Sequence, residues 1–509
     1  MPSPSAFPYI QTMPLSHSQE RRRFRARDFL WLALFTFAAL SIHGYHLGIE
    51  DQAIYLPGVK FDLNPALYPH DAEFFLPQVR PTLIDEIAAY SSKFMHLGVE
   101  GSVFLWHLLS IFLFLAAALR IARRCFERER QAWAGLALLT VLLTIPVTGT
   151  ALYIVDQYLH PRTLATAFIL FAIPDVMDRR WLRATVMIFL AALVHIQMAF
   201  FGGLFLVFLA WPTVFGSLRG RAIFFGLPLA TLFEPGSPAW REAMLTRSQH
   251  FLLKWAWYEW LGIFGPLVIL WMIASMTERS WRQDDATSFR TTLCKSLVYY
   301  GGFCFVVGLI VTIPQRLERL TPYQPMRGFH LIYLLFFLIL GGLIFERVLR
   351  AQVWLYAVLL IGTSIGMFYA QRDLFPGTRH IEWPGRDTGN RWVRAFVWIR
   401  ENTPREAYFA LDPRYMMQRG EDEHGFRGLA ERGALADWDK DPGVICLFPA
   451  LAPKWQEQVH AQDGFASFGR DEVLHLRQRF GADWVIADHS MGLSACPYQK
   501  DGIYVCRIE

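Results

Sequence analysis

The chain has 509 residues, of which 53% are hydrophobic and only 18% are charged, whereas soluble proteins carry roughly a quarter charged residues. Because the apolar residues are concentrated in blocks, the sequence is typical of a polytopic membrane protein and not of a soluble domain. A formal net charge of +5 is small for this length and gives no indication of nucleic-acid binding.

The N-terminal residues 1–28 combine a Pro- and Ser-rich stretch with five arginines, and we expect a disordered, basic, cytoplasmic segment. An apolar run follows from Phe29 to Ile42. Secretory signal peptides also begin in this way. No small-residue cleavage site follows the run, however, which favours an uncleaved signal anchor.

About eleven apolar segments approach the length that a bilayer requires. They span 29–45, 101–120, 132–150, 163–175, 182–196, 198–215, 222–234, 260–276, 293–313, 329–345 and 352–370. We therefore expect a transmembrane domain over 29–371, with a long first outward loop at 46–99.

The loops between these segments indicate the orientation of the chain. With the N-terminus inside, arginine clusters fall in the loops expected on the cytoplasmic side, and the longer outward loops are poorer in Lys and Arg, as the positive-inside rule requires. The clusters are Arg120/Arg123/Arg124/Arg128/Arg130, Arg179/Arg180/Arg183, Arg219/Arg221, Arg279/Arg282 and Arg347/Arg350. An odd number of spans then places residues 372–509 outside.

Residues 372–509 carry more charge and lack a spanning segment. Apolar runs predict strands at Tyr408–Leu411, Val444–Phe448, Trp484–Ala487 and Ile503–Cys506, and the stretches between them predict helices at Arg391–Glu401, Pro453–Gln462 and Asp471–Arg479. This alternation predicts a small extracytoplasmic α/β domain with a partly parallel sheet. Since no Gly-rich phosphate loop accompanies the strands, we interpret the domain as a lid or recognition module.

The six cysteines have no metal-binding spacing. Cys496 and Cys506 lie near the C-terminus. On the outer side of a membrane they would either form a disulfide or remain as two free thiols.

An acidic pair, Glu50 and Asp51, follows the first apolar segment, where a membrane helix should leave the bilayer. Acids there are costly unless they face water or a polar site, so the pair is either a solvated helix end or part of a functional site. The same loop carries seven acids against three bases, and in it carboxylates flank a histidine: His70, Asp71 and Glu73.

Two later outward loops add candidate groups. Asp156, His160 and Arg162 lie within seven residues beside a helix start, and an arginine there could hold a phosphate through paired donors. The alternative is an interfacial belt of Tyr, His and Arg. Gln324 and Arg327 lie at the start of the tenth segment, where a cation is costly unless it has a partner such as an anionic substrate group.

Other outward residues have simpler interpretations. His195 and Gln197 lie between the fifth and sixth segments, and we interpret the lone histidine as hydrogen-bonded packing. Loop 234–259 mixes tryptophans with basic residues, which suits a helix lying on the membrane surface. The same mixture could also hold a lipid phosphate.

A first span followed directly by an acidic pair resembles the GT-C superfamily of polytopic glycosyltransferases, which use polyprenyl-phosphate sugars. The stretch from Glu50 to Tyr55 is similar to their acidic signature, in which the pair precedes a small residue and an aromatic one. His46–Phe75 and Gln324–Arg327 resemble an uncharacterised bacterial branch of this group. In the best-known members the pair is often Asp-Glu, whereas here it is Glu-Asp, so either acid could align with the functional one.

The resemblance implies a mainly α fold and sugar transfer from a polyprenyl-phosphate donor to a lipid, glycan or protein acceptor. It places the reaction at the outer face of a bacterial inner membrane, in cell-envelope synthesis. Asp51 would be the base or the acid that positions the acceptor, with Glu50 as the alternative and Asp156 as a second acid. The substrate-binding residues would be His70, Asp71, Glu73, His160, Arg162, Gln324 and Arg327.

A divalent cation, Mg²⁺ or Mn²⁺, held by Asp51 and Asp156 is compatible with these acids, but no spacing demands one. Two other classes remain open. A secondary transporter should show internal repeats, and the chain has none that we detect. A non-catalytic scaffold for envelope polysaccharide assembly would keep the fold without the chemistry.

Overall fold

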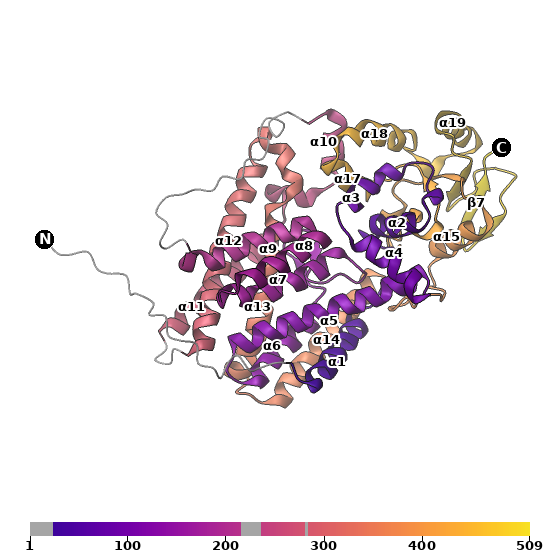
Figure 1. The fold of residues 1–509 in the computed structure, drawn as a ribbon. Coiled ribbons are helices and arrows are strands. Elements are labelled where there is room, and N and C mark those ends of the chain that lie inside the picture. Colours follow the sequence, from indigo (N-terminus) through magenta and orange to yellow (C-terminus); the bar gives the residue numbers. More distant parts are fainter. Residues whose placement is uncertain (1–23, 215–235, 280–283) are drawn as a thin grey trace.

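The computed structural model describes residues 24–214, 236–279 and 284–509. Most of the predicted N-terminal segment and the predicted span 222–234 lie outside these residues. The described chain forms a helical body, which continues through a folded connecting region into a C-terminal α/β domain (Figure 1).

With one partial exception, the predicted apolar segments within the described residues coincide with helices. The helices are α1 (Ala26–His43), α5 (Val99–Cys125), α6 (Glu129–Val141), α7 (Pro161–Met177), α8 (Trp181–Val194), α9 (Ile196–Val214), α11 (Trp257–Glu278), α12 (Asp285–Thr312), α13 (Phe329–Leu343) and α14 (Val353–Leu374). The segment 132–150 is only partly helical. The chain leaves α6 and forms a hairpin of β1 (Pro146–Val147) and β2 (Leu152–Tyr153), since Pro146 has no N–H to continue a helix.

Within the described residues, six helical segments are long and apolar enough to cross a membrane. They are α1, α5, α11, α12, α14 and Arg316–Val348, which contains α13. Helices α8 and α9 are apolar but shorter. The chain is therefore a mainly α membrane protein with a small C-terminal sheet domain.

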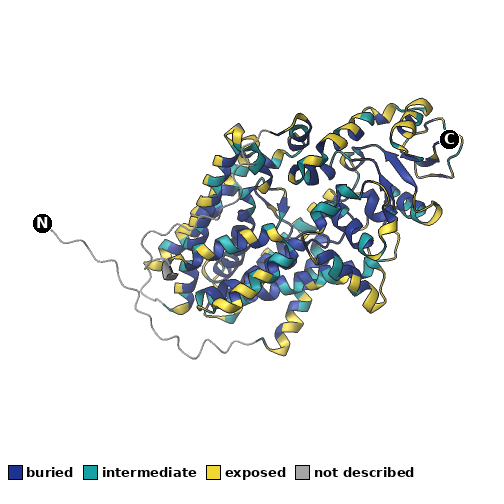
Figure 2. Cartoon of the chain, turned by 45° about the horizontal axis from the view of Figure 1, so that its top comes forward, coloured by how far each residue is buried: buried dark blue, intermediate teal, exposed yellow. Residues whose placement is uncertain are grey.

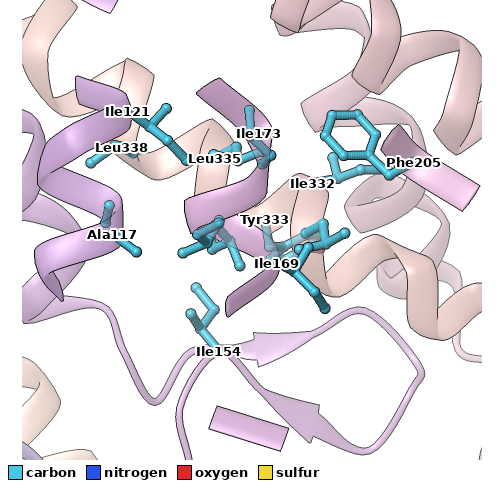
Figure 3. Packing of buried hydrophobic residues seen from close by; sticks show 14 of the residues in the cluster. Ala117, Ile121, Ile154, Ile169, Ile173, Phe205, Ile332, Tyr333, Leu335 and Leu338 are labelled. Atoms are coloured by element: carbon cyan, nitrogen blue, oxygen red, sulfur yellow. The ribbon is translucent and has the colours of Figure 1, made fainter. Parts of the chain in front are cut away.

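The core of the helical body lies around α5, α7 and α13. Side chains from these helices interdigitate between Ala117, Ile173 and Leu335 (Figure 3). By contrast, α11 and α14 expose large apolar side chains, and Figure 2 shows exposed residues along the rim of the body. Exposed apolar surface on spanning helices is expected where lipid is the solvent.

The first outward loop is folded and not extended. It forms α2 (Gln52–Leu63), α3 (Leu76–Val79) and α4 (Ile84–Met95), and these helices lie between the helical body and the C-terminal domain (Figure 1). This region positions the acidic pair, which stands at the start of α2.

The C-terminal domain contains a five-stranded sheet in the order β4-β3-β5-β7-β6. The strands are β3 (Tyr408–Leu411), β4 (Gly433–Ala434), β5 (Trp484–Ala487), β6 (Tyr498–Lys500) and β7 (Ile503–Arg507). Strands β4, β3 and β5 are parallel, while β7 and β6 are antiparallel to their neighbours. The predicted partly parallel sheet is confirmed.

Helices cover both faces of this sheet. α15 (Arg391–Asn402) and α16 (Phe426–Ala430) pack on one face, α19 (Arg470–Phe480) packs on the other, and α10 (Pro238–Leu245), α17 (Asp441–Leu447) and α18 (Ala452–Ala461) form a further cluster. The predicted strand at Val444–Phe448 is wrong, because this run belongs to α17. Pro442 in the first turn favours a helix start, and a short apolar run does not separate strand from buried helix.

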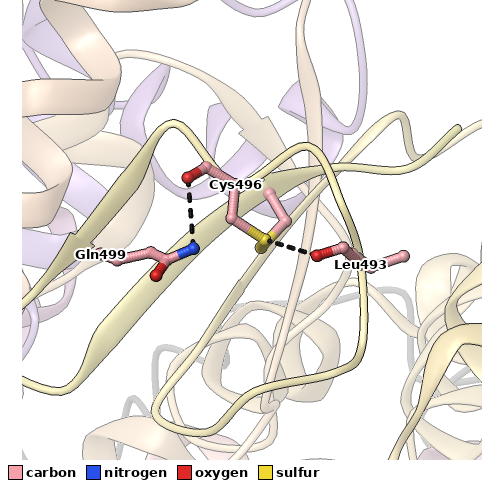
Figure 4. The surroundings of a disulfide bond; sticks show 4 residues. Leu493, Cys496 and Gln499 are labelled. Carbon is pink, nitrogen blue, oxygen red and sulfur yellow. Dashed lines mark hydrogen bonds between the residues drawn. A yellow bond between two sulfur atoms is a disulfide. The ribbon is translucent and has the colours of Figure 1, made fainter.

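Cys496 and Cys506 form a disulfide (Figure 4). It ties the segment before β6 to β7, and the Cys496 carbonyl accepts a hydrogen bond from Gln499. Of the two alternatives for these cysteines, a disulfide or two free thiols, the structure has the disulfide.

A buried carboxylate joins the two domains. Glu382 Oε1 lies 2.9 Å from His46 Nδ1 and 3.0 Å from His424 Nε2, and its other oxygen accepts from the Leu47 N–H. All three side chains are at most 1% exposed. Backbone bridges between Tyr45 and Ile381 and between Ile49 and His424 complete this interdomain clamp.

Replacing Glu382 should destabilise the protein. Burial opposes ionisation of Glu382, but His424 and His46 outweigh burial and lower its pKa to about 2. Burial opposes the charged form of His424, but Glu382 outweighs burial and raises its pKa above 6.5. Removing one partner of a buried ion pair costs about 3–5 kcal/mol, so Glu382→Ala should lower the thermal unfolding midpoint.

The pH dependence of this effect follows from the two pKa directions. The contribution of Glu382 is lost as pH falls from about 4.5 toward 2, and that of His424 is lost as pH rises through its raised pKa. The difference in unfolding midpoint between wild type and Glu382→Ala should be largest near about pH 5.5. The control is Glu457→Ala, which removes an exposed partner of Arg479. Equal effects of the two substitutions would contradict the clamp.

Candidate active site

The turn between α1 and α2 has a constrained backbone. Gly44 ends α1 with φ of +80°, and a Cβ there would lie 2.4 Å from the His380 carbonyl oxygen. Glu50 has φ of +49°, a conformation that costs energy for a residue other than glycine and that clusters at functional sites. Asp51 then stands at the N-cap of α2.

A glutamine side chain connects this turn to the second outward loop. Gln52 accepts a hydrogen bond from the Gly48 N–H and donates one to the Leu159 carbonyl. The His46 N–H also donates to the Gln157 carbonyl. These contacts bring Asp51 next to His160, although the two residues lie far apart in sequence.

Glu50 faces the C-terminal domain. Lys440 Nζ lies 2.8 Å from Glu50 Oε2, 3.0 Å from Glu423 Oε2 and 2.8 Å from Asp439 Oδ2. The Lys440 side chain is 5% exposed. Burial raises the pKa of Glu50 to about 7, against the opposing charge of Lys440 and with help from Glu423 and Asp51. Glu50 therefore titrates near neutral pH.

Asp51 faces His160, with 3.3 Å between Asp51 Oδ2 and His160 Nε2. The Asp51 side chain is 40% exposed, whereas that of His160 is 2% exposed. Burial raises the pKa of Asp51, but the hydrogen bond with His160 and the charges of Arg162 and Lys440 outweigh this effect and hold the pKa well below its usual range. Asp51 is thus a partly exposed carboxylate that is ionised at neutral pH.

His160 is neutral. Burial and the charge of Arg162 lower the pKa of His160, although Asp51 and Asp156 oppose this shift. His160 Nδ1 accepts the Arg162 N–H at 3.0 Å, so the single proton of a neutral imidazole lies on Nε2. His160 therefore donates to Asp51 and fixes the orientation of that carboxylate.

Arg162 and Asp156 form a buried ion pair. Arg162 Nη2 lies 2.6 Å from Asp156 Oδ1 and 2.8 Å from Asp156 Oδ2, and the side chains are 3% and 2% exposed. Arg162 Nε has no hydrogen-bond partner among the described residues. The pair engages both oxygens of Asp156, and the Nε donor of Arg162 is not used in it.

Arg327 is a further cation of the site; it is half-buried, and amides hold it in place. Its Nε donates to Gln324 Oε1 and its Nη1 donates to Gln197 Oε1, both at 2.7 Å. Within the described part of the chain, no carboxylate pairs with it. The charges of Arg162 and Asp51 both act on Arg327, so the three side chains share one site. Gln324 itself has φ of +44°.

The remaining predicted site residues contact the C-terminal domain instead. Asp71 accepts hydrogen bonds from the Tyr408 hydroxyl and from Gln458, and Lys454 Nζ lies 2.5 Å from both Asp71 and Glu73. The ring of His70 packs on Tyr408. These contacts account for the three polar side chains, and their role in substrate binding stays a prediction.

Two residues of the site were not predicted from the sequence. Lys440 comes from the C-terminal domain, and no local pattern connects it with Glu50. Gln197 was given no role of its own, but it orients Arg327. Its only sequence signal was a polar side chain next to His195 at the end of an apolar segment.

The predicted metal ligands do not match a cation site as arranged. Asp156 is engaged by Arg162. In the described part of the chain, Asp51, Asp156 and His160 do not form a set of three ligand atoms within 4.8 Å of one another. A cation bound by Asp51 and Asp156 stays a prediction, and Asp156 is paired with Arg162 in this arrangement.

Comparison with known proteins gives little guidance. No protein-family model matches the chain, and no curated protein matches it. Among solved structures, the chain is similar to the archaeal oligosaccharyltransferase AglB from Archaeoglobus fulgidus, solved with an inhibitory peptide and a dolichol-phosphate. The TM-score is 0.40 at 11% identity, covering 90% of this chain and 69% of AglB. A TM-score this low carries no argument about function.

The ion pair of Arg162 with Asp156 should have a structural as well as an electrostatic role. Asp156→Asn leaves the Arg162 charge buried without a counter-charge, which should cost about 3–5 kcal/mol and lower the thermal unfolding midpoint. Replacing both residues, in Asp156→Leu/Arg162→Met, should restore much of that loss, because no uncompensated charge remains. A double variant less stable than Asp156→Asn would contradict this account.

Proposed function

We propose that the chain is a membrane glycosyltransferase that transfers a sugar from a polyprenyl-phosphate donor to an acceptor hydroxyl or amide at the outer face of the membrane. The observation that carries the proposal is that Asp51, a partly exposed carboxylate, acts electrostatically on Arg327, a half-buried cation whose side-chain hydrogen bonds in the described part of the chain go to amides. The resemblance of Glu50–Tyr55 to the GT-C acidic signature agrees with it.

The charges suggest where each substrate group binds. A phosphate carries negative charge that increases as it leaves the sugar, and preorganised cations stabilise that charge. Arg327 and the Nε of Arg162, which has no partner in the described part of the chain, are suitable donors for it. The acceptor then approaches from the side of the acidic pair, since a carboxylate repels the phosphate.

The two acids have different environments and therefore different roles. A general base works best with a pKa near the operating pH, which fits Glu50, with its pKa of about 7. Asp51, with its low pKa, orients the acceptor hydrogen. In the transfer step, the acceptor forms a bond to the anomeric carbon and gives its proton to Glu50. The bond from that carbon to the phosphate oxygen breaks, and polyprenyl phosphate leaves.

Two observations favour an outward site. The disulfide between Cys496 and Cys506 lies in the domain that supplies Lys440, and structural disulfides persist in oxidising compartments. The arginine clusters of the loops assign the opposite side to the cytoplasm. A bacterial inner membrane with a periplasmic C-terminal domain is the corresponding localisation.

The first test is sugar transfer or release from a radiolabelled polyprenyl-phosphate hexose by the full-length protein in detergent. Loss of a positioned acid costs about 10²–10⁴-fold in rate, so we expect Asp51→Asn to reduce turnover by about 100-fold or more, while donor binding remains. Arg327→Gln should instead weaken donor binding by about 10–100-fold, because a charge-assisted contact is lost.

Matched controls separate these effects from general damage. Asp463→Asn and Arg479→Gln change exposed residues of the C-terminal domain and should leave turnover and donor binding unchanged. If the wild type neither turns over nor binds the lipid donor, the proposed function is wrong. Full turnover in Asp51→Asn would agree with the proposed enzymatic activity but would show that Asp51 has no role in catalysis.

The pH–rate profile tests the division of roles. With Glu50 as base, kcat/KM should rise as pH increases through about 7, since only the ionised form accepts a proton. The negative charge of Asp51 contributes to the raised pKa of Glu50. The residual activity of Asp51→Asn should therefore have its inflection at lower pH. An unshifted inflection would argue against Glu50 as the titrating group.

A further inference from the structure

A second group of carboxylates lies at the opposite end of α2 from Asp51. Asp62 is in the last turn of α2, about 16 Å along the helix axis from Asp51 at 1.5 Å per residue. Asp85 and Glu86 are in the first turn of α4. One oxygen from each of the three carboxylates lies within 4.8 Å of the other two. The acids therefore converge from two helices that pack together.

Each carboxylate of this acidic triad has an oxygen with no hydrogen-bond partner in the described part of the chain. The oxygens are Asp62 Oδ2, Asp85 Oδ1 and Glu86 Oε2. Asp85 is only 4% exposed, so bulk water does not solvate its oxygen. A buried charged group without a partner costs several kcal/mol. Solvent-inaccessible, unpartnered oxygens on all three residues distinguish the triad from ordinary surface acids and point to a ligand that carboxylates bind.

Protein cations do not meet this need. Arg80 acts on Asp62 electrostatically, but its side chain is exposed, and no ion pair joins it to the triad within the described residues.

We propose that Asp62, Asp85 and Glu86 bind a calcium ion that links the end of α2 to the start of α4. Calcium accepts six to eight oxygen ligands in a flexible arrangement, whereas magnesium requires a near-ideal octahedron. Three carboxylates held on two separate helices therefore suit calcium better. Asp62 and Glu86 are half-buried, which leaves room for water ligands.

The position of the ion gives it a structural role near the active site. Helix α2 carries Asp51 at its start and Asp62 near its end. An ion that joins the end of α2 to the start of α4 would hold α2 in place along its length. The calcium site does not depend on the sugar-transfer proposal, because none of its three residues belongs to that site.

The test uses the full-length protein in detergent, stripped with EGTA. Calcium chloride alone should raise the thermal unfolding midpoint of the wild type, and calorimetric titration should show saturable binding. Asp85→Asn and Glu86→Gln each remove one charged ligand and should weaken calcium binding by about 10–100-fold, because affinity follows the ligand charge count. In EGTA, Asp85→Asn should unfold no earlier than the wild type, since it removes repulsion between like charges.

Two controls make the outcome specific. Asp471→Asn changes an exposed first-turn acid of α19, and Asp51→Asn changes the proposed active site. Both should keep the full calcium response. The proposal is wrong if calcium changes neither the midpoint nor the heat in the wild type, or if Asp85→Asn and Glu86→Gln both retain wild-type affinity. If Asp85→Asn does not fold, the calcium affinity of Glu86→Gln decides the outcome, because Glu86 is only half-buried and its substitution disturbs the fold less.

Discussion

The buried carboxylate of Glu382 is the contact on which the arrangement of the site depends. It binds His46 from the turn after α1 and His424 from the C-terminal domain, in a place from which water is excluded. A buried charge is stable only when its partners remain in position. The clamp therefore fixes the backbone of the residues that lead to Glu50 and Asp51, and with it the direction of both acids.

This constraint explains why two neighbouring acids have different chemistry. Glu50 points toward Lys440, where burial dominates and its pKa rises to about 7. Asp51 points toward His160, and the neighbouring hydrogen bond and cations hold its pKa low. Two carboxylates with pKa values set apart by their environments are a common basis for acid–base catalysis. Neither environment exists without the C-terminal domain and the second outward loop.

Much of the fold could be predicted from the sequence, because its patterns are local. Long apolar segments have few alternatives to helices in a membrane, and the described ones are helical. Strands β3, β5 and β7 were predicted at nearly their observed positions. The error at Val444–Phe448 has a local cause as well, since a short apolar run fits a buried helix as well as a strand. The segment 222–234 lies outside the described residues.

The sequence by itself determined the membrane character, the helical segments, the α/β nature of the C-terminal domain and the placement of Glu50 and Asp51 directly after the first span. Only the tertiary structure decided which charges meet. Lys440 reaches Glu50 across 390 positions of sequence, and Arg327 lies beside Arg162 and Asp51 because Gln197 and Gln324 hold it there. Hydrophobic periodicity is a property of neighbouring residues, whereas an ion pair depends on how distant segments pack, and no local pattern records that packing.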